Sequence, residues 1–275
     1  GYEIYEAEGE KSMKKKLLAA FLCLAMAFSL AACGDSDDAG KTDKKKDSKD
    51  DGKKVYQVAT DTTFAPFEFE NDEGDMVGID LDILAAIAED QGFEYELQIV
   101  GFQAAVNALE AGQADAVIAG MSITDERKAK YDFSDEYYQS GVGMAVKKDS
   151  DIDSYEDLKG KTVAAKLGTE GCTFAESIAD QYGFTVTQFE DSSTMYQDVI
   201  SGNTVACFED YPVMGYEIAR GLELKLPLDM EKGAPYGFAV MKGENAELLK
   251  MFNAGLANLK ESGKYDEILD TYIKK

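Results

Sequence analysis

Histidine is absent from this 275-residue chain, and its absence excludes several kinds of chemistry. The usual general base, the His-based catalytic triads and the commonest metal ligand are all missing. Catalysis would have to use carboxylates, lysine, tyrosine or cysteine instead. The sequence also lacks a phosphate-binding loop of the G-x-x-x-x-G-K-[ST] type, so any ATP hydrolysis belongs to other chains. No metal and no cofactor are predicted.

Positive charge is scarce: 28 Lys and Arg stand against 53 Asp and Glu, a formal net charge of −25. Residues 1–32 hold four Lys and four Glu, and residues 33–54 hold seven Lys and seven Asp, so the charges of both segments cancel. The whole excess therefore falls on residues 55–275. Phosphate backbones require the opposite sign, so nucleic-acid binding is excluded, and an acidic surface that keeps the domain in solution is expected.

The first 32 residues show the layout of a secretory signal. Residues 1–12 are acidic and have no apolar period, and we interpret them as extraneous to the fold. Met13 is the expected start, because three lysines, an apolar run over 17–30 and small residues follow it. This run is shorter than the roughly 20 residues that a membrane-spanning helix needs. Residues 13–32 are therefore predicted to be a signal peptide.

Residues 30–33 (LAAC) resemble a bacterial lipobox, which implies cleavage before Cys33 and attachment of lipid to it. Residues 33–54 are Asp, Lys, Ser and Gly with almost no apolar side chain, and we expect a disordered tether. The domain would then lie at the extracellular face of the cell membrane, or in the periplasm if there is an outer membrane. Cys172 and Cys207 are left either to pair or to remain free, buried thiols.

Residues 55–275 are predicted to form an α/β fold, because short apolar runs alternate with helix-period segments. The 79–90 segment places Ile79, Ile83, Leu84 and Ile87 on one helical face and stops before Gly92. The alternation favours largely parallel sheets. The predicted strands are 55–60, 94–99, 116–119, 142–146, 162–165, 185–189, 206–209 and 238–240.

One internal echo indicates where a ligand could bind. Residues 112–120 (GQADAVIAG) and 202–210 (GNTVACFED) align without gaps, each with a helix-ending glycine, a polar turn and an apolar strand. In open α/β sheets, ligands bind beyond the carboxyl ends of strands. Gly120 and Asp210 are therefore expected at corresponding points of two facing lobes.

Several motifs together resemble the amino-acid-binding proteins of ABC importers, closest to the glutamine and lysine/arginine/ornithine receptors. They are 61–69 (DTTFAPFEF), 78–82 (GIDLD), 120–127 (GMSITDER), 133–138 (FSDEYY), 157–161 (DLKGK), 168–169 (GT), 210–212 (DYP) and 259–266 (LKESGKYD). The resemblance covers nearly all of 55–275. It implies a two-lobed periplasmic-binding-protein fold of type II, with a ligand cleft between lobes joined by two hinge strands.

The same resemblance implies lobe boundaries and partners. Lobe 1 would be 55–140 plus 237–275 and lobe 2 would be 141–236, with hinges at 137–141 and 232–236. A ligand that touches both lobes would stabilise the closed form. The implied partners are a free amino acid and the permease and ATPase subunits of an ABC transporter. A monomer is expected.

A free amino acid presents a carboxylate and an ammonium group, and both must be satisfied once water is excluded. By resemblance, Arg127 grips the carboxylate in a bidentate pair, and Ser122 adds donors. Asp210 and the carbonyl group of Gly120, which follows Ala119, would hold the ammonium group. The remaining matched positions are two aromatic walls, Phe64 and Phe102, and Thr169 and Glu170 at a helix start where backbone N–H groups meet a carboxylate.

The far end of the ligand is the least determined part of the site. Asp61 and Lys166 match positions that read the ligand's side chain, and one acceptor with one donor suits a carboxamide, so glutamine is favoured. A basic amino acid is the alternative ligand, provided that the side chain of Lys166 turns away from it and forms a salt bridge with Glu170 or Glu209. Cystine is another alternative ligand. A cyclohexadienyl dehydratase-like enzyme, with Glu170 or Glu209 as acid, is the alternative from another class.

Overall fold

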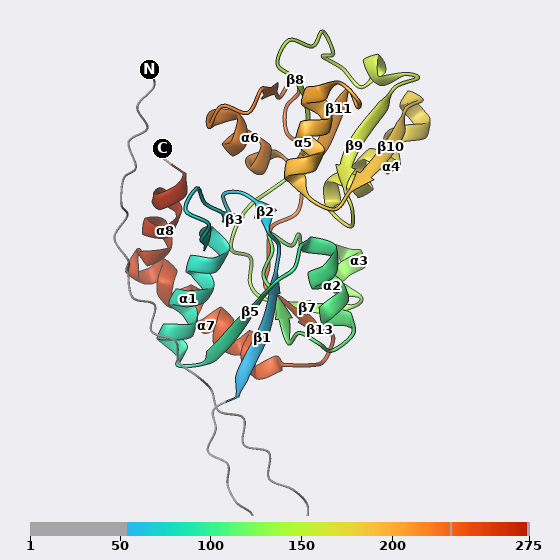
Figure 1. The fold of residues 1–275 in the computed structure, drawn as a ribbon. Coiled ribbons are helices and arrows are strands. Elements are labelled where there is room, and N and C mark those ends of the chain that lie inside the picture. Colours follow the sequence, from blue (N-terminus) through green and yellow to red (C-terminus); the bar gives the residue numbers. More distant parts are fainter. Residues whose placement is uncertain (1–53, 232, 274–275) are drawn as a thin grey trace, which may run out of the picture. The chain divides into compact units, whose positions relative to one another are not determined.

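The structure, a computed structural model, describes residues 54–231 and 233–273 (Figure 1). The predicted signal peptide, Cys33 as the predicted site of lipid attachment, and all but the last residue of the predicted tether lie outside this range. Within it, no helix combines the length and apolar character needed to cross a membrane. The chain folds into two lobes, each built around a five-stranded sheet.

The sheet of the first lobe has the order β5-β1-β6-β13-β7. Its strands are β1 (Val55–Thr60), β5 (Glu94–Ile99), β6 (Ala116–Val117), β7 (Tyr131–Phe133) and β13 (Ala239–Met241). A small antiparallel sheet lies beside it, formed by β2 (Thr63–Phe64), β3 (Glu68–Glu70) and β4 (Met76–Val77).

Helices cover both faces of the first sheet because its buried side chains alternate between them. Val58 packs in the core with α1 (Ile79–Gln91), α7 (Ala246–Ser262) and α8 (Lys264–Tyr272). Its neighbour Ala59 packs in a separate core with α2 (Phe102–Glu110). This is the two-residue period of a strand buried on both faces. Figure 1 shows α1, α7 and α8 on one side and α2 with α3 (Asp125–Lys128) on the other.

The sheet of the second lobe has the order β10-β9-β11-β8-β12. Its strands are β8 (Val142–Lys147), β9 (Thr162–Lys166), β10 (Thr185–Phe189), β11 (Ala206–Asp210) and β12 (Leu224–Lys225). Its helices are the short η1 (Glu156–Leu158), α4 (Glu170–Tyr182), α5 (Ser192–Ser201) and α6 (Tyr211–Ala219). Phe208 packs on the α4 side of the sheet, while its neighbour Cys207 packs against α5 and α6.

The two sheets repeat one pattern, which confirms the sequence echo. β6 and β11 are the central strands, and each runs parallel to one neighbour and antiparallel to the other. The prediction of largely parallel sheets was wrong, because half of the strand pairs in the two five-stranded sheets are antiparallel. All of these antiparallel pairs involve β8 or β13. Each of the two strands joins its sheet directly after the chain has crossed over from the other sheet. No crossover helix above their own sheet forces them to run parallel.

Two chain segments connect the sheets, between β7 and β8 and between β12 and β13. They run side by side: the N–H of Tyr236 donates to the carbonyl oxygen of Tyr138 at 2.8 Å, and that of Glu231 donates to Val142 at 2.8 Å. A Cβ on Gly233 would lie 2.1 Å from the Cα of Gly141, so the close approach requires glycine. Lys232, in the predicted hinge, lies outside the described residues.

Candidate functional site

Ten of the predicted site residues line a single, very small cavity. They come from both lobes, and Asp210 ends the central strand β11 while Gly120 lies shortly after the central strand β6, as the echo predicted. The ten are Asp61, Phe64, Phe102, Ala119, Gly120, Ser122, Arg127, Thr169, Glu170 and Asp210. The remaining predicted residue, Lys166, does not line this cavity but forms an ion pair with Asp61 in its wall.

The guanidinium of Arg127 is held in a fixed orientation, although an arginine side chain is long and has several rotatable bonds. It lies in the short helix α3, which begins where the hydroxyl oxygen of Thr124 accepts the N–H of Arg127 at 3.2 Å. Its guanidinium donates to the carbonyl oxygens of Ser122 and Gly168, each at 3.0 Å. The group also lies 5.5 Å from the centre of the Phe102 ring. A guanidinium fixed in this way can accept a carboxylate in a defined geometry.

Glu170 shares the guanidinium of Arg127, with 3.6 Å between its Oε1 and Nη2 of the arginine. It is the first residue of α4, and Thr169 is the N-cap, whose hydroxyl oxygen accepts the N–H of Cys172 at 3.3 Å. The N-terminus of this 13-residue helix thus contributes two residues to the cavity wall. Such an end favours a negatively charged ligand group.

Asp210 is one of three acidic residues that line the cavity, with Asp61 and Glu170. It ends β11, and its Oδ2 accepts hydrogen bonds from Ser140, at 3.1 Å, and from the hydroxyl of Tyr236. Burial raises the pKa of Asp210 to about 6, although these hydrogen bonds and the charge of Arg127 act in the opposite direction. A ligand ammonium group beside it would favour the ionised form.

Aromatic rings close the cavity between the charged groups. Phe64 and Phe102 are each 5% exposed. Gly120 lets the first ring approach: its φ is 51°, and a Cβ there would lie 2.4 Å from a carbon of the Phe64 ring. A larger residue would therefore displace the ring and strain the backbone. The walls suit an aliphatic stem.

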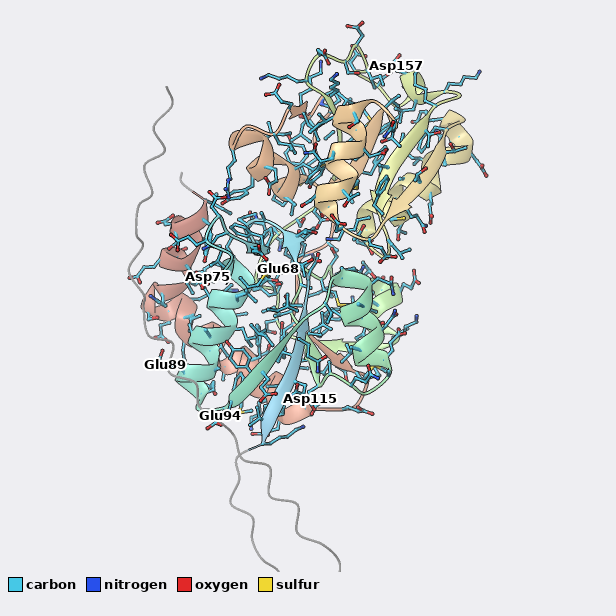
Figure 2. The ribbon with its side chains drawn as sticks, viewed as in Figure 1. Glu68, Asp75, Glu89, Glu94, Asp115 and Asp157 are labelled. Atoms are coloured by element: carbon cyan, nitrogen blue, oxygen red, sulfur yellow. The ribbon has the colours of Figure 1, made fainter. Side chains whose placement is uncertain are left out.

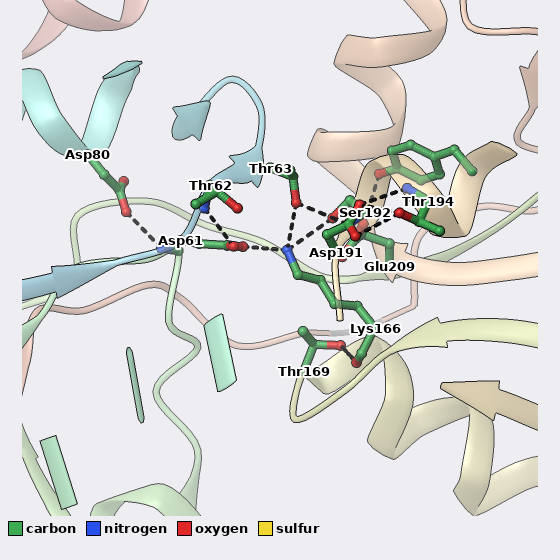
Figure 3. Close-up of polar contacts among 12 residues, drawn as sticks. Asp61, Thr62, Thr63, Asp80, Lys166, Thr169, Asp191, Ser192, Thr194 and Glu209 are labelled. Atoms are coloured by element: carbon green, nitrogen blue, oxygen red, sulfur yellow. Dashed lines mark hydrogen bonds and ion pairs between the residues drawn. The ribbon is translucent and has the colours of Figure 1, made fainter. Parts of the chain in front are cut away.

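Lys166 is wholly buried at the end of β9, and Figure 3 shows its ammonium group among Asp61, Thr63 and Ser192. Its ammonium group forms an ion pair with Asp61 and donates to Oγ of Ser192 at 3.1 Å. Burial lowers the pKa of Lys166, but the charges of Asp61 and Glu209 outweigh it and the net pKa is raised. The group therefore stays positively charged.

The suggested salt bridge of Lys166 with Glu170 or Glu209 is not formed within the described residues. Glu170 pairs with Arg127, and Glu209 accepts a hydrogen bond from the hydroxyl of Tyr196 at 2.9 Å. Burial raises the pKa of Glu209 to about 7, against the opposing charge of Lys166. The partner of Lys166 is instead Asp61, which precedes β2. This ion pair connects the two lobes, since Asp61 lies in the first and Lys166 in the second.

Sequence reasoning missed the hydroxyl groups that complete the site. Ser140 and Tyr236 bind Asp210, Ser192 binds Lys166, and Thr63 lies 3.4 Å from Nζ of that lysine. Isolated hydroxyl residues carry no sequence signal, since they are usually turn or cap residues. Only the packing of distant segments gives them a role.

Cys172 and Cys207 are both free and buried. One lies in α4 and the other in β11, so of the two alternatives the structure has free thiols. Burial raises the pKa of Cys172 to about 11, which makes its thiolate rare at neutral pH. In the described part of the chain, no cluster of three or more acidic or cysteine side chains could hold a metal ion.

Known proteins with similar sequences bind amino acids. The chain is 36% identical over 275 residues to the ABC transporter glutamine-binding protein GlnH of Bacillus subtilis (strain 168), covering 96% of this chain and 98% of that protein. It is 32% identical over 256 residues to the arginine-binding extracellular protein ArtP of the same strain, covering 92% and 96%.

Solved structures agree with the sequence comparison. An ancestral arginine-binding protein, solved with arginine bound and again with glutamine bound, is 38% identical and covers 80% of this chain and 98% of its own. The TM-scores are 0.75 and 0.74. These neighbours confirm the predicted two-lobed α/β fold.

A family model described as bacterial extracellular solute-binding proteins, family 3, matches residues 56–275. This match confirms the resemblance that the motifs indicated. The description is that of proteins that bind solutes. Together with the similar proteins, it shows that the chain belongs to the family 3 solute-binding proteins, among the amino-acid-binding members that serve ABC transporters.

Proposed function

We propose that this chain captures one polar amino acid, with glutamine favoured, and delivers it unchanged to the permease of an ABC importer. The observation that carries the proposal is a small cavity in which Arg127 and Asp210 present opposite charges. A zwitterion needs this pair of charges, because its carboxylate and ammonium group both lose water on binding. The aromatic walls supply apolar contact for the part between them.

Glutamine is favoured by the state of the far end of the cavity. Lys166 and Asp61 form a buried ion pair, with no net charge between them. Asp61 of this pair lines the cavity, and a neutral carboxamide can donate to its carboxylate without adding a buried charge. A cationic side chain would compete with Lys166 for Asp61. The similarity to a glutamine-binding protein supports this choice.

A basic amino acid is the second candidate, and two observations favour it. The chain is also similar to arginine-binding proteins, and the carboxylates of Glu170 and Glu209 lie close to the cavity or to its far end. If Lys166 moved, the carboxylate of Glu209 could interact with the positively charged side chain of the ligand. A dehydratase-like enzyme has weaker support, because Glu170 is already paired with Arg127 and Glu209 with Tyr196.

The cellular arrangement is part of the same proposal. Residues 55–140 with 237–275 and residues 141–236 would be the two lobes that close on the ligand, turning about the two connections. Lipid on Cys33 would anchor a monomer to the extracellular face of the membrane, or within a periplasm, where permease and ATPase subunits accept the closed form. The family membership supports the extracellular location and the transporter partner.

Calorimetric titration tests the binding function. Residues 55–275, freed of endogenous ligand, are titrated with glutamine, arginine, lysine, histidine and cystine. Prephenate is added as the substrate that tests the dehydratase-like alternative. We expect one strong site for glutamine. A stronger heat with arginine or lysine would retain the receptor and change its specificity, whereas silence with every amino acid, or turnover of prephenate, would contradict the proposal.

A further inference from the structure

Two acidic side chains are buried in the first lobe outside the cavity lining. Glu68 lies in β3 and Asp80 in the first turn of α1, and both are 0% exposed. Figure 2 shows Glu68 inside the first lobe, whereas Glu89 and Asp157 point to solvent. If both groups are ionised, no donor among the described residues reaches either oxygen of Glu68 or Oδ1 of Asp80, so that these oxygens face only each other's acceptors. Two unpaired buried carboxylates would be very unfavourable, so a proton must be present.

The other oxygen of Asp80 joins two parts of the binding machinery. Oδ2 accepts the backbone N–H of Gly120 at 2.7 Å and the hydroxyl of Tyr137 at 2.7 Å. Gly120 lines the cavity with a left-handed backbone, and Tyr137 lies in the connection between the lobes. Tyr137 is itself held there, since its N–H donates to the carbonyl oxygen of Tyr236 at 3.0 Å.

We propose that Glu68 and Asp80 share one proton and act as positioning residues for the ligand. The proton resides on Glu68, whose hydroxyl donates to Oδ1 of Asp80, so that Oδ2 remains a charged acceptor for Gly120 and Tyr137. Because the N–H of Gly120 is fixed, the carbonyl group of Gly120 is then oriented toward the ligand's ammonium group. This last step rests on the proposed amino-acid-binding function, whereas the shared proton does not.

The surroundings place the proton on Glu68 rather than on Asp80. Burial, followed by the charges of Asp80 and Asp61, raises the pKa of Glu68 well above its ordinary value, and only Lys166 opposes this. Burial raises the pKa of Asp80 to about 6, opposed by the hydrogen bonds from Gly120 and Tyr137. The other titratable groups that face the pair are tyrosines: Tyr137, Tyr236 and Tyr265. These phenols stay neutral at physiological pH, so they do not supply a competing charge.

Infrared difference spectroscopy of the wild type against Glu68→Gln tests the shared proton. At pH 7.5 the wild type should show the C=O stretching band of a protonated carboxylic acid, and the variant should lose most of it and keep only the smaller part that partly protonated Glu209 supplies. Glu70→Gln, an exposed change in the same strand, is the control and should keep the band. A wild type without the band, or a variant that retains it in full, would overturn the proposal.

Stability against pH gives a second readout of the same proton. A raised folded-state pKa means that the contribution of Glu68 is full below its unfolded pKa, near 4.5, and is lost as the pH rises toward its folded value. Chemical denaturation should therefore show a smaller fall of stability with pH in Glu68→Gln than in the wild type. Equal slopes would contradict the inference.

Positioning is tested by glutamine titration of the folded variants. Asp80→Asn replaces the charged acceptor by a neutral one and should raise the Kd about tenfold, the usual effect of one charge-assisted hydrogen bond. Glu68→Gln keeps a donor toward Oδ1 and should stay within about threefold of the wild type. Asp82→Asn, in the same helix turn, should leave the Kd unchanged.

The outcomes separate this inference from the proposed function. If Asp80→Asn binds as the wild type does, Asp80 is not a positioning residue. If the wild type binds no amino acid, the proposed function fails, and the positioning role fails with it. The infrared band and the stability slope still decide whether the proton is shared.

Discussion

The two ends of the cavity hold their charges in different ways. At one end, Arg127 donates to two backbone carbonyl groups, and its partner Glu170 is 28% exposed. At the other, the ion pair of Lys166 and Asp61 is almost completely buried, at 0% and 1% exposure. At the first end, Arg127 can give up Glu170 for an incoming carboxylate with little loss of free energy. At the second end, breaking the buried pair of Lys166 and Asp61 would cost much more free energy.

This difference assigns the two ends separate tasks. The carboxylate and ammonium group are common to all amino acids, so a readily exchanged cation suits their recognition. The side chain differs between amino acids, and a rigid buried pair discriminates better, because a wrong group leaves a buried charge unpaired. Changes at Arg127 should therefore affect all ligands alike, and changes at Lys166 should affect some more than others.

The largest effect is expected from Arg127→Ala. The ligand carboxylate would lose its charged partner in a site of low dielectric, so the Kd of every amino acid should rise by at least about a hundredfold. Calorimetry with the same ligand panel measures this. Lys128→Ala removes an exposed neighbouring charge and is the matched control. Normal binding by Arg127→Ala would refute the site assignment.

Lys166→Met should change both stability and preference. Asp61 would remain as a buried carboxylate without its cation, so the free energy of unfolding should fall by about 3 kcal/mol. Glutamine should lose about thirtyfold in affinity, while arginine should lose less because its own cation can meet Asp61. Denaturant titration and calorimetry measure the two effects. Lys161→Met, just before the same strand, controls for loss of a surface lysine. An equal loss for both ligands would remove Lys166 from the specificity determinants.

Affinity should depend on pH through Asp210. Its pKa in the free protein is raised to about 6, and only the carboxylate form pairs with an ammonium group. As pH falls through 6, the ligand must displace a proton, so the Kd should rise toward about tenfold per pH unit. Titrations from pH 8 to pH 4.5 measure this. Asp210→Asn should bind weakly with a flatter profile; an unchanged profile would assign the titration to another group.

The smallest effect is expected from Glu170→Gln, and its sign identifies the ligand class. Glu170 competes with the ligand carboxylate for Arg127, so glutamine should bind about twofold to threefold more tightly without this partly exposed charge. A basic ligand that uses Glu170 should instead bind more weakly. Glu176→Gln, later in α4, should change neither. Weaker binding of glutamine would show that Glu170 supports the ligand rather than competing with it.

Much of the fold was predictable because long elements carry a periodic signal. The strands 55–60, 94–99 and 185–189 were predicted with the bounds that the structure gives, and the helix from residue 79 ends one residue later than expected. The strands β2, β4 and β12 were missed, because two residues cannot display a period. The prediction of largely parallel sheets failed at β8 and β13, because the direction of a strand depends on the side from which the chain enters the sheet.

The sequence by itself determined which residues gather at the site, because their motifs and the echo around Gly120 and Asp210 are local patterns. Tertiary structure alone decided what those residues do to one another. The pairing of Lys166 with Asp61, rather than with Glu170 or Glu209, depends on side chains 105 positions apart in the chain. The burial of Glu68 beside Asp80 is of the same kind. Charge pairing and proton sharing are set by distance and by exclusion of water, and both arise only when the lobes are packed.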